Sequence, residues 1–133
     1  MLIAVADTHA LLWYIYNDSR LSSRARQVFA EAVESENSVG FSPITYVELI
    51  YLQEKQRVDP AVLERFIAAI DAADSILLEL PITRFVAMSV LDVVRAQVPD
   101  LPDRVISATT IAHRVPLITR DRRIATSSVQ TIW

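Results

Sequence analysis

Four acidic residues stand where carboxylates could act together. Asp7 and Asp121 each follow an apolar run that resembles a buried strand. Asp103 opens a predicted helix, with Asp100 three residues before it. Glu48 shares a face with apolar residues of another predicted helix, and a carboxylate in such a place costs free energy unless it is paired. These positions predict a shared site rather than scattered surface charge.

Four converging carboxylates would repel one another unless a cation neutralised them. Mg²⁺ and Mn²⁺ are hard ions that prefer carboxylate and water oxygens. An ion held in this way can lower the pKa of a bound water and stabilise charge on a scissile phosphate. The acidic residues therefore predict metal-dependent hydrolysis of a phosphodiester.

Each acid also has an ordinary structural interpretation. Asp7 and Asp103 could be helix caps and Asp121 a turn former. Glu48 would need an arginine partner to be purely structural. Because two of the four follow strands, the set as a whole favours the functional interpretation.

The order of elements places these acids at one edge of a sheet. The predicted strands are Leu2–Ala6, Val39–Phe41, Ile76–Leu80, Pro116–Thr119 and Gln130–Trp133. The predicted helices are His9–Tyr16, Ser22–Glu34, one that opens at Ser42-Pro43 and includes Ile44–Leu52, one that starts at Asp59-Pro60, Pro81–Arg95, and Val105–His113. Alternation of this kind predicts an α/β fold, with a parallel sheet covered by helices on both faces. Ligands of such sheets bind outside the carboxyl ends of the strands.

The segment Ile44–Leu52 is apolar almost all the way round. We expect this helix to be buried on two sides. Together with the helix that carries Trp13, it suggests a surface that a second subunit or another protein completes.

Composition narrows the chemistry further. The chain of 133 residues has no cysteine, so a metal would be held by oxygen or by His9 and His113, although packing histidines are the favoured interpretation of these two. No apolar run reaches the roughly 20 residues of a membrane-spanning helix. No basic leader precedes Asp7, so we expect a soluble, cytoplasmic, single-domain protein spanning residues 1–133.

The net charge of −3 hides a local excess of arginine between residues 103 and 123. Arginine suits bidentate contact with phosphate, so Arg104, Arg120 and Arg122 are candidates for contact with a nucleic acid, although a solvated surface explains them equally well. Trp13, Tyr14 and Tyr16 could stack on bases, but burial in the core or in a subunit interface is the favoured alternative.

Two threonines lie close to the acids. Thr8 and Thr119 could hydrogen-bond a metal-bound water, or they could be strand-end residues without such a role. A glycine-rich phosphate loop is missing, which excludes nucleotide binding of that kind. A phosphatase that uses a nucleophilic Asp needs a second acid two residues later, whereas Asp7 is followed by Thr8 and His9.

Four ordered motifs resemble the PIN-domain nucleases, in particular the VapC-type toxins of toxin–antitoxin pairs. They are Asp7-Thr8-His9-Ala10-Leu11-Leu12-Trp13, Ser42-Pro43-Ile44-Thr45-Tyr46-Val47-Glu48, Pro102-Asp103-Arg104-Val105-Ile106-Ser107-Ala108-Thr109, and Pro116-Leu117-Ile118-Thr119-Arg120-Asp121-Arg122-Arg123-Ile124. The resemblance covers nearly the whole chain. It departs where relatives often carry phenylalanine soon after the last aspartate, a position occupied here by Arg122-Arg123-Ile124.

The resemblance implies a PIN-like three-layer sandwich with a five-stranded parallel sheet in the order 3-2-1-4-5. It also implies Mg²⁺-dependent endoribonuclease activity, with Mn²⁺ a possible substitute, and products with 5′-phosphate and 3′-hydroxyl ends. By motif, Asp7, Glu48, Asp103 and Asp121 form the catalytic quartet, and Asp7, Asp103 and Asp121 are the metal ligands. Asp100 matches an acid found in only some relatives.

The partners implied by the resemblance are an RNA substrate, a VapB-type antitoxin and a second copy of the chain. The alternative function is a non-catalytic RNA- or protein-binding module on the same scaffold. Such a module has no reason to keep four mutually repelling acids.

Overall fold

The sheet has the predicted strand order. The computed structural model describes all residues from 1 to 133. Its strands are β1 (Leu2–Ala6), β2 (Ser38–Phe41), β3 (Leu77–Glu79), β4 (Leu117–Ile118) and β5 (Thr131–Ile132). They form one sheet in the order β3-β2-β1-β4-β5, and every neighbouring pair is parallel. This confirms the α/β fold class and brings the ends of β1 and β4 together.

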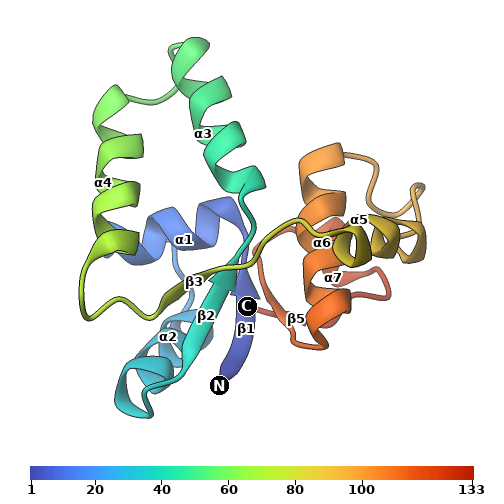
Figure 1. The fold of residues 1–133 in the computed structure, drawn as a ribbon, viewed down its shortest axis with the longest axis horizontal. Coiled ribbons are helices and arrows are strands. Elements are labelled where there is room, and N and C mark those ends of the chain that lie inside the picture. The colour runs from blue at the N-terminus through green and yellow to red at the C-terminus, as the bar shows by residue number, and fades with distance from the viewer.

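Helices cover both faces of this sheet (Figure 1). They are α1 (Thr8–Ile15), α2 (Ser23–Glu34), α3 (Ile44–Glu54), α4 (Pro60–Asp71), α5 (Arg84–Ser89), α6 (Leu101–His113) and α7 (Arg122–Ala125), with a 3₁₀ turn, η1, at Val90–Asp92. In Figure 1, α3 and α4 project together beyond the sheet, and α5 and α6 stand apart from them on the other side. α3 and α6 nevertheless contact each other.

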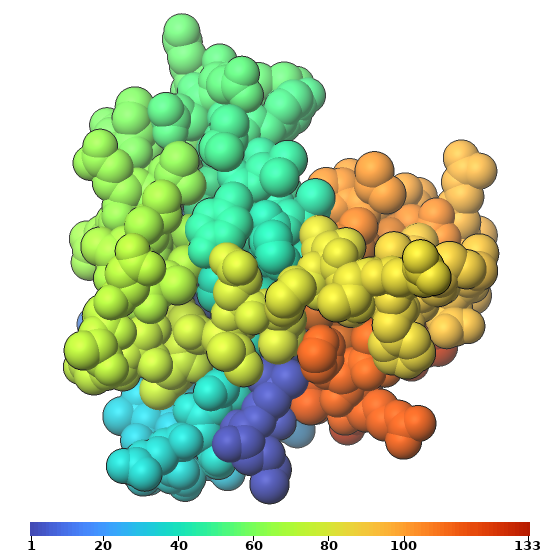
Figure 2. All heavy atoms as spheres, viewed as in Figure 1, coloured from blue at the N-terminus to red at the C-terminus, as the bar shows by residue number.

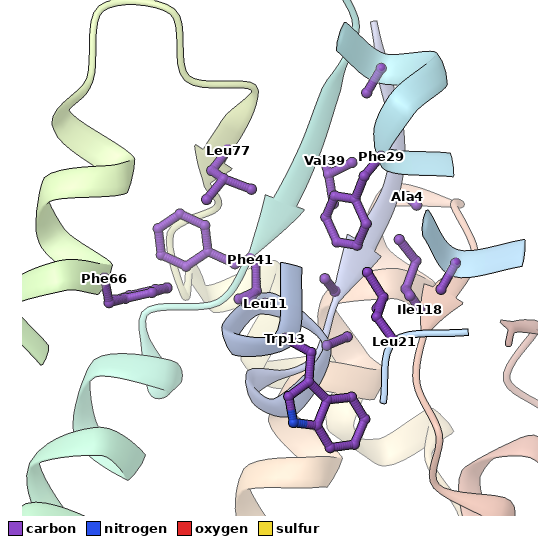
Figure 3. Close-up of a cluster of buried hydrophobic side chains, with 14 of the residues drawn as sticks. Ala4, Leu11, Trp13, Leu21, Phe29, Val39, Phe41, Phe66, Leu77 and Ile118 are labelled. Atoms are coloured by element: carbon purple, nitrogen blue, oxygen red, sulfur yellow. The ribbon is translucent and has the colours of Figure 1, made fainter. Parts of the chain in front are cut away.

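Alternate residues of the central strand enter different cores. Ala4 and Ala6 of β1 belong to the larger core, whose side chains come mainly from the sheet, α1, α2 and α4 (Figure 3). Val5 faces the opposite way and packs with Leu117, Ile106 of α6 and other residues of a smaller core. This alternation fixes β1 between two helical layers, because a slip of one residue would exchange its faces.

Gly40, the only glycine, lets the segment around Leu80 pass close over the sheet. A methyl group at Gly40 of β2 would overlap Leu80 Cδ1 and press on Leu2 Cδ1. The missing side chain therefore lets Leu80 cover the sheet as the chain leaves β3 toward α5.

The prediction of one helix over Pro81–Arg95 was wrong in its length. The observed helix, α5, begins after a Thr83 cap, whose hydroxyl accepts from Val86 N, and gives way to the 3₁₀ turn after Ser89. Arg104 Nη2 donates to the Val90 and Val93 carbonyl oxygens at 3.2 and 3.0 Å. These carbonyls thus have a partner outside the helix, which stabilises the early turn.

Two further expectations need correction. The helix expected to open at Asp103 begins at Leu101, because the Asp100 carboxylate caps it by accepting from Asp103 N. The expected burial of α3 on two sides was also wrong: Val47 and Tyr51 are 58 % and 56 % exposed. Since α3 projects past the sheet, only its inner side is covered.

No helix combines the length and apolar character needed to span a bilayer.

Candidate active site

A polar cavity of about 580 Å³ lies at the carboxyl ends of β1 and β4. Its lining brings all four predicted acids together with Asp100 and residues of a basic and aromatic rim: Asp7, His9, Trp13, Glu48, Asp100, Asp103, Arg120, Asp121 and Arg122. We call this space the acidic cavity. It draws on four separate parts of the sequence, so only the folded chain assembles it.

Asp7 is held at the junction of β1 and α1. Its N–H donates to Ile118 O of β4 at 3.1 Å, and its carboxylate accepts from Ala10 N at 2.9 Å. Only 9 % of the residue is exposed. Burial raises the pKa of this carboxyl, while the Thr119 hydroxyl and Ala10 N–H act in the opposite direction. Asp7 is thus both a helix cap and a wall of the cavity.

Glu48 has a hydroxyl partner rather than the arginine that a structural role required. Thr8 Oγ1 donates to Glu48 Oε1 at 2.7 Å. Thr8 Oγ1 also lies 3.1 Å from Thr45 Oγ1. A hydroxyl has one proton to donate, so Thr45 is the donor to Thr8. Burial is the main cause that raises the pKa of Glu48.

Thr45 is a component of the site that sequence reasoning missed. It is completely buried on the inner side of α3, three residues before Glu48. That spacing places the two side chains on one helix face, which was the available signal. The two linked hydrogen bonds, from Thr45 to Thr8 and from Thr8 to Glu48 Oε1, hold the Glu48 carboxylate in one orientation.

Asp103 is a strongly perturbed acid of the cavity. It lies in the first turn of α6 and is half-buried. Burial raises its pKa to about 7, and the negative charges of Asp100, Asp121, Glu48 and Asp7 add to the effect in that order. A carboxyl with such a pKa is poised to bind a cation, because the cation would relieve the repulsion.

Asp121 combines a turn with a cap. Its carboxylate accepts from Arg123 N at 2.8 Å and starts the short helix α7, which the sequence did not predict. Its own N–H donates to the buried Thr119 hydroxyl at 3.0 Å. Since the Thr119 hydroxyl also acts on Asp7, it links the end of β1 to the start of α7.

The three candidate arginines are placed differently. Arg120 and Arg122 line the acidic cavity, and Arg120 Cζ lies 5.7 Å from the centroid of the Trp13 ring. Arg104 instead points at the carbonyls of η1, as described above, and does not line the cavity. Its geometry supports a structural role rather than contact with a ligand in this cavity.

The two histidines do not form a pair in this cavity. His9 is exposed and lines the cavity, with its ring centroid 5.7 Å from that of Trp13. His113 is exposed at the end of α6 and lies outside the cavity lining. His9 thus packs on Trp13 at the surface, whereas His113 is exposed at the end of its helix.

The donor set suits a divalent cation in chemistry. The carboxylates of Asp7, Glu48 and Asp103 are hard oxygen donors, and their pKa values are raised mainly by burial, with neighbouring acids adding to the effect. No three His, Asp or Glu side chains are arranged to hold one metal ion as they stand. Binding would therefore require some of these side chains to turn toward one another.

Relatives of known structure share the fold. The chain superposes on a VapBC2 structure from Rickettsia felis bound to a DNA fragment from its promoter with a TM-score of 0.71, 13 % identity, and coverage of 98 % of this chain and 97 % of the other. It superposes on DNA-bound VapBC from Salmonella typhimurium with a TM-score of 0.68, 22 % identity, and coverage of 98 % and 97 %. A toxin–antitoxin complex from Klebsiella pneumoniae gives a TM-score of 0.60, 24 % identity, and coverage of 92 % and 91 %.

Sequence comparison points the same way. The chain is 28 % identical over 124 residues to Ribonuclease VapC22 of Mycobacterium tuberculosis, covering 93 % of this chain and 91 % of that protein. The family model described as PIN domain matches residues 4–127. Since this match spans nearly the whole chain, the protein belongs to the PIN-domain family.

Proposed function

We propose that this protein is a metal-dependent endoribonuclease, the VapC-type toxin of a toxin–antitoxin pair. The observation that carries the proposal is the assembly of Asp7, Glu48, Asp103 and Asp121 around one cavity at the edge of the sheet. The likeness to Ribonuclease VapC22 supports RNA as the substrate.

The four acids have different parts in this proposal. Asp7, Asp103 and Asp121 are the proposed ligands of Mg²⁺, which Mn²⁺ could replace. When bound, the ion would supply Lewis-acid chemistry and an activated water to a phosphodiester. Glu48, oriented by Thr8, offers a carboxylate of raised pKa that can accept a proton at Oε2, the oxygen not bonded to Thr8. Thr119 keeps Asp7 and Asp121 in place.

The basic rim completes the substrate site. Arg120 and Arg122 border the acids at the mouth of the cavity. An RNA strand is a polyanion, so it would be repelled by the carboxylates and attracted by these guanidinium groups. We propose that the two arginines hold the phosphates next to the bond that is cut.

The proposed partners are an antitoxin of the VapB type and a second copy of the chain. The antitoxin is supported by the superposed VapBC structures and by the Klebsiella pneumoniae structure, which is named a toxin–antitoxin complex. The dimer is supported by apolar side chains on the outer side of α3, where Val47, Ile50 and Tyr51 are half-exposed. Figure 2 shows the upper part of α3 projecting past α6, while its lower part lies against that helix. Sedimentation of the isolated chain as a monomer at micromolar concentration would contradict the dimer.

The deciding experiment is cleavage of total cellular RNA by purified protein in Mg²⁺, in Mn²⁺ and in EDTA, beside the Asp7→Asn variant. We expect discrete products that require the metal and disappear in the variant. End-group analysis should find 5′-phosphate and 3′-hydroxyl termini. A folded, antitoxin-free protein that binds Mg²⁺ but cleaves no RNA would replace this proposal with the non-catalytic binding module.

A further inference from the structure

A second hollow lies beside the acidic cavity. Its volume is about 410 Å³, and it shares His9 and Trp13 with that cavity. Its other walls come from α1, the loop after α1, the end of α3 and the start of α4. We call it the ring pocket. Because the two spaces share a wall, a chain-like ligand could occupy both at once.

The wall of the ring pocket combines rings with aliphatic side chains. Tyr16, at the end of α1, is 37 % exposed, and the His9 ring is exposed between the two spaces. Tyr14, by contrast, stacks on Phe29 in the core at a centroid distance of 4.1 Å. The favoured core interpretation thus holds for Tyr14 but not for Tyr16. Arg65 Cζ lies 4.1 Å from the centroid of the Tyr16 ring and covers one of its faces, so a nucleobase would meet the remaining exposed part of Tyr16 and the His9 ring.

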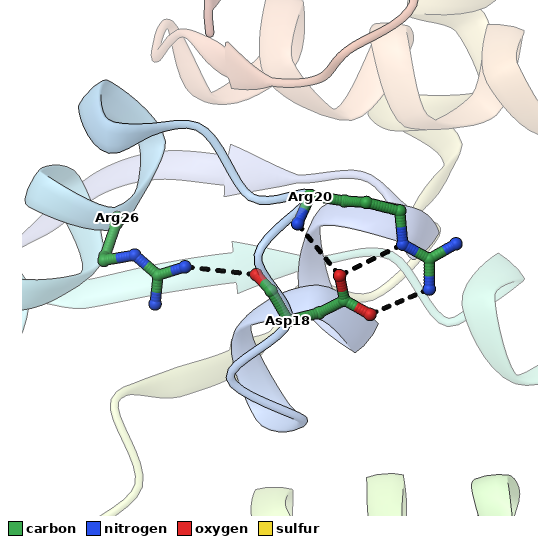
Figure 4. Close-up of polar contacts among 3 residues, drawn as sticks. All are labelled: Asp18, Arg20 and Arg26. Carbon is green, nitrogen blue, oxygen red and sulfur yellow. Dashed lines mark hydrogen bonds and ion pairs between the residues drawn. The ribbon is translucent and has the colours of Figure 1, made fainter.

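The charge of the ring pocket is opposite to that of the acidic cavity. Five of the nine residues that line the acidic cavity are carboxylates. The ring pocket has one, Asp18, and the guanidinium of Arg20 binds both of its oxygens, at 3.0 and 2.8 Å (Figure 4). A carboxylate paired in this way presents little net charge to a ligand.

Arg57 supplies the unneutralised positive charge. It lines the ring pocket and forms no ion pair, because the Arg20–Asp18 pair is the only salt bridge of the protein. Its backbone N–H donates to Leu52 O at 2.9 Å, which fixes the base of the side chain at the end of α3. The guanidinium is therefore available to a phosphate.

We propose that the ring pocket binds the base and phosphate of an unpaired nucleotide adjoining the bond that is cut. Tyr16 and His9 would contact the base, and Arg57 the phosphate. This inference rests on the proposed function in its choice of RNA. It adds a site that would select single-stranded substrate, since a base held in a duplex cannot present its face to a side chain.

The test separates binding from cleavage. The Asp103→Asn protein is titrated in EDTA with a fluorescein-labelled 12-nucleotide single-stranded RNA of mixed sequence, alone and with Tyr16→Leu or Arg57→Gln added. Tyr16→Leu should raise the dissociation constant about five- to tenfold. Arg57→Gln should raise it about threefold and reduce the slope of log K against log salt by about 0.7. Arg24→Gln, a change of an exposed arginine on α2, is the matched control and should alter neither.

Two further readouts make the result specific. Tyr16→Leu should leave the weaker binding of the same RNA as a duplex unchanged. In the otherwise native chain, both variants should raise KM for the single strand more than they lower kcat. If both folded variants bind the single strand as tightly as before, the ring pocket is not a nucleotide site, even if the native chain cleaves RNA. The pocket would then be assigned to a protein partner. If the two substitutions weaken single-strand binding but the native chain cleaves no RNA, the ring pocket is kept as a binding site and the nuclease proposal is rejected.

Discussion

The two walls of the acidic cavity are held in different ways. On the side of α1 and α3, Asp7 accepts from Ala10 N, and Glu48 is directed by Thr8. On the side of α6, Asp100 is used as a cap, and Asp103 next to it has no hydrogen bond to its carboxylate among the side-chain contacts of the structure. The first wall is therefore fixed by the fold, whereas the second holds a carboxylate without a donor, whose charged form is disfavoured first by burial and then by the neighbouring acids.

This difference assigns different tasks to the walls. A carboxylate fixed by hydroxyl and amide donors keeps its direction whether or not a ligand is present. A carboxylate raised to a pKa of about 7 by burial and by neighbouring acids is stabilised most by an incoming cation. We therefore expect the first wall to set geometry and the second to respond to metal.

The largest expected effect is the loss of RNA cleavage when either wall loses a proposed metal ligand. Asp7→Asn and Asp103→Asn should each lower kcat on the order of a thousandfold while the circular dichroism spectrum is kept. Asp92→Asn, which changes an exposed aspartate in η1, is the control and should cleave normally. Substantial cleavage by the purified Asp7→Asn, Asp103→Asn double variant would contradict the proposed site.

The strands and the acids that follow them could be predicted from the sequence, because both are local patterns. The buried strand Leu2–Ala6 and the apolar run before Thr119 are local patterns, and acids that follow strands of a parallel sheet converge at one edge. The strand order itself came from the family resemblance. Thr45 was missed because its role exists only when α3 lies against the start of α1, which no local pattern encodes.

The other misses have the same origin. Asp103 was expected to open its helix, but Asp100 competes for that place, and Pro102 is compatible with either start. The length of α5 depends on Arg104, fourteen residues beyond Val90 in the chain. The exposure of α3 depends on how far it extends past the sheet. Each outcome was decided by contacts between distant segments.

An intermediate effect is expected from the fixed wall. Thr45→Val removes the hydroxyl that donates to Thr8, so Thr8 and Glu48 lose their imposed direction. We expect kcat to fall about tenfold with KM little changed, and stability to fall by about 1 kcal/mol. Thr45→Ser keeps the donor and should restore kcat, which loss of packing alone would not explain. An equal loss of kcat in both variants would remove Thr45 from the positioning role.

The responsive wall should show itself in the pH dependence of stability. Folded Asp103 binds its proton below a pH of about 7, whereas the ordinary value is 3.8. Between these values the folded state holds more protons than the unfolded state, so the free energy of unfolding falls as pH rises. In EDTA, Asp103→Asn should therefore be more stable than the native chain by about 1–2 kcal/mol at pH 8, after allowance for solvent screening, and similar to it near pH 4.

Urea titrations of both proteins from pH 4 to 8 would measure this difference. Added Mg²⁺ should stabilise the native chain at pH 8 and have little effect on the variant, because the ion replaces the missing positive charge. Native and variant stabilities that remain parallel across this pH range would show that the charge of Asp103 is already compensated within the folded protein.

The smallest expected effect distinguishes the two kinds of arginine near the site. Arg120→Gln should raise the dissociation constant for single-stranded RNA about threefold and flatten its salt dependence, because Arg120 borders the acidic cavity. Arg104→Gln should leave RNA binding unchanged but lower stability by about 1–3 kcal/mol, because Arg104 holds the Val90 and Val93 carbonyls. Filter binding at several salt concentrations, with urea titrations of the same proteins, separates the two roles. If Arg104→Gln weakened RNA binding without loss of stability, the contact with η1 would not describe its function.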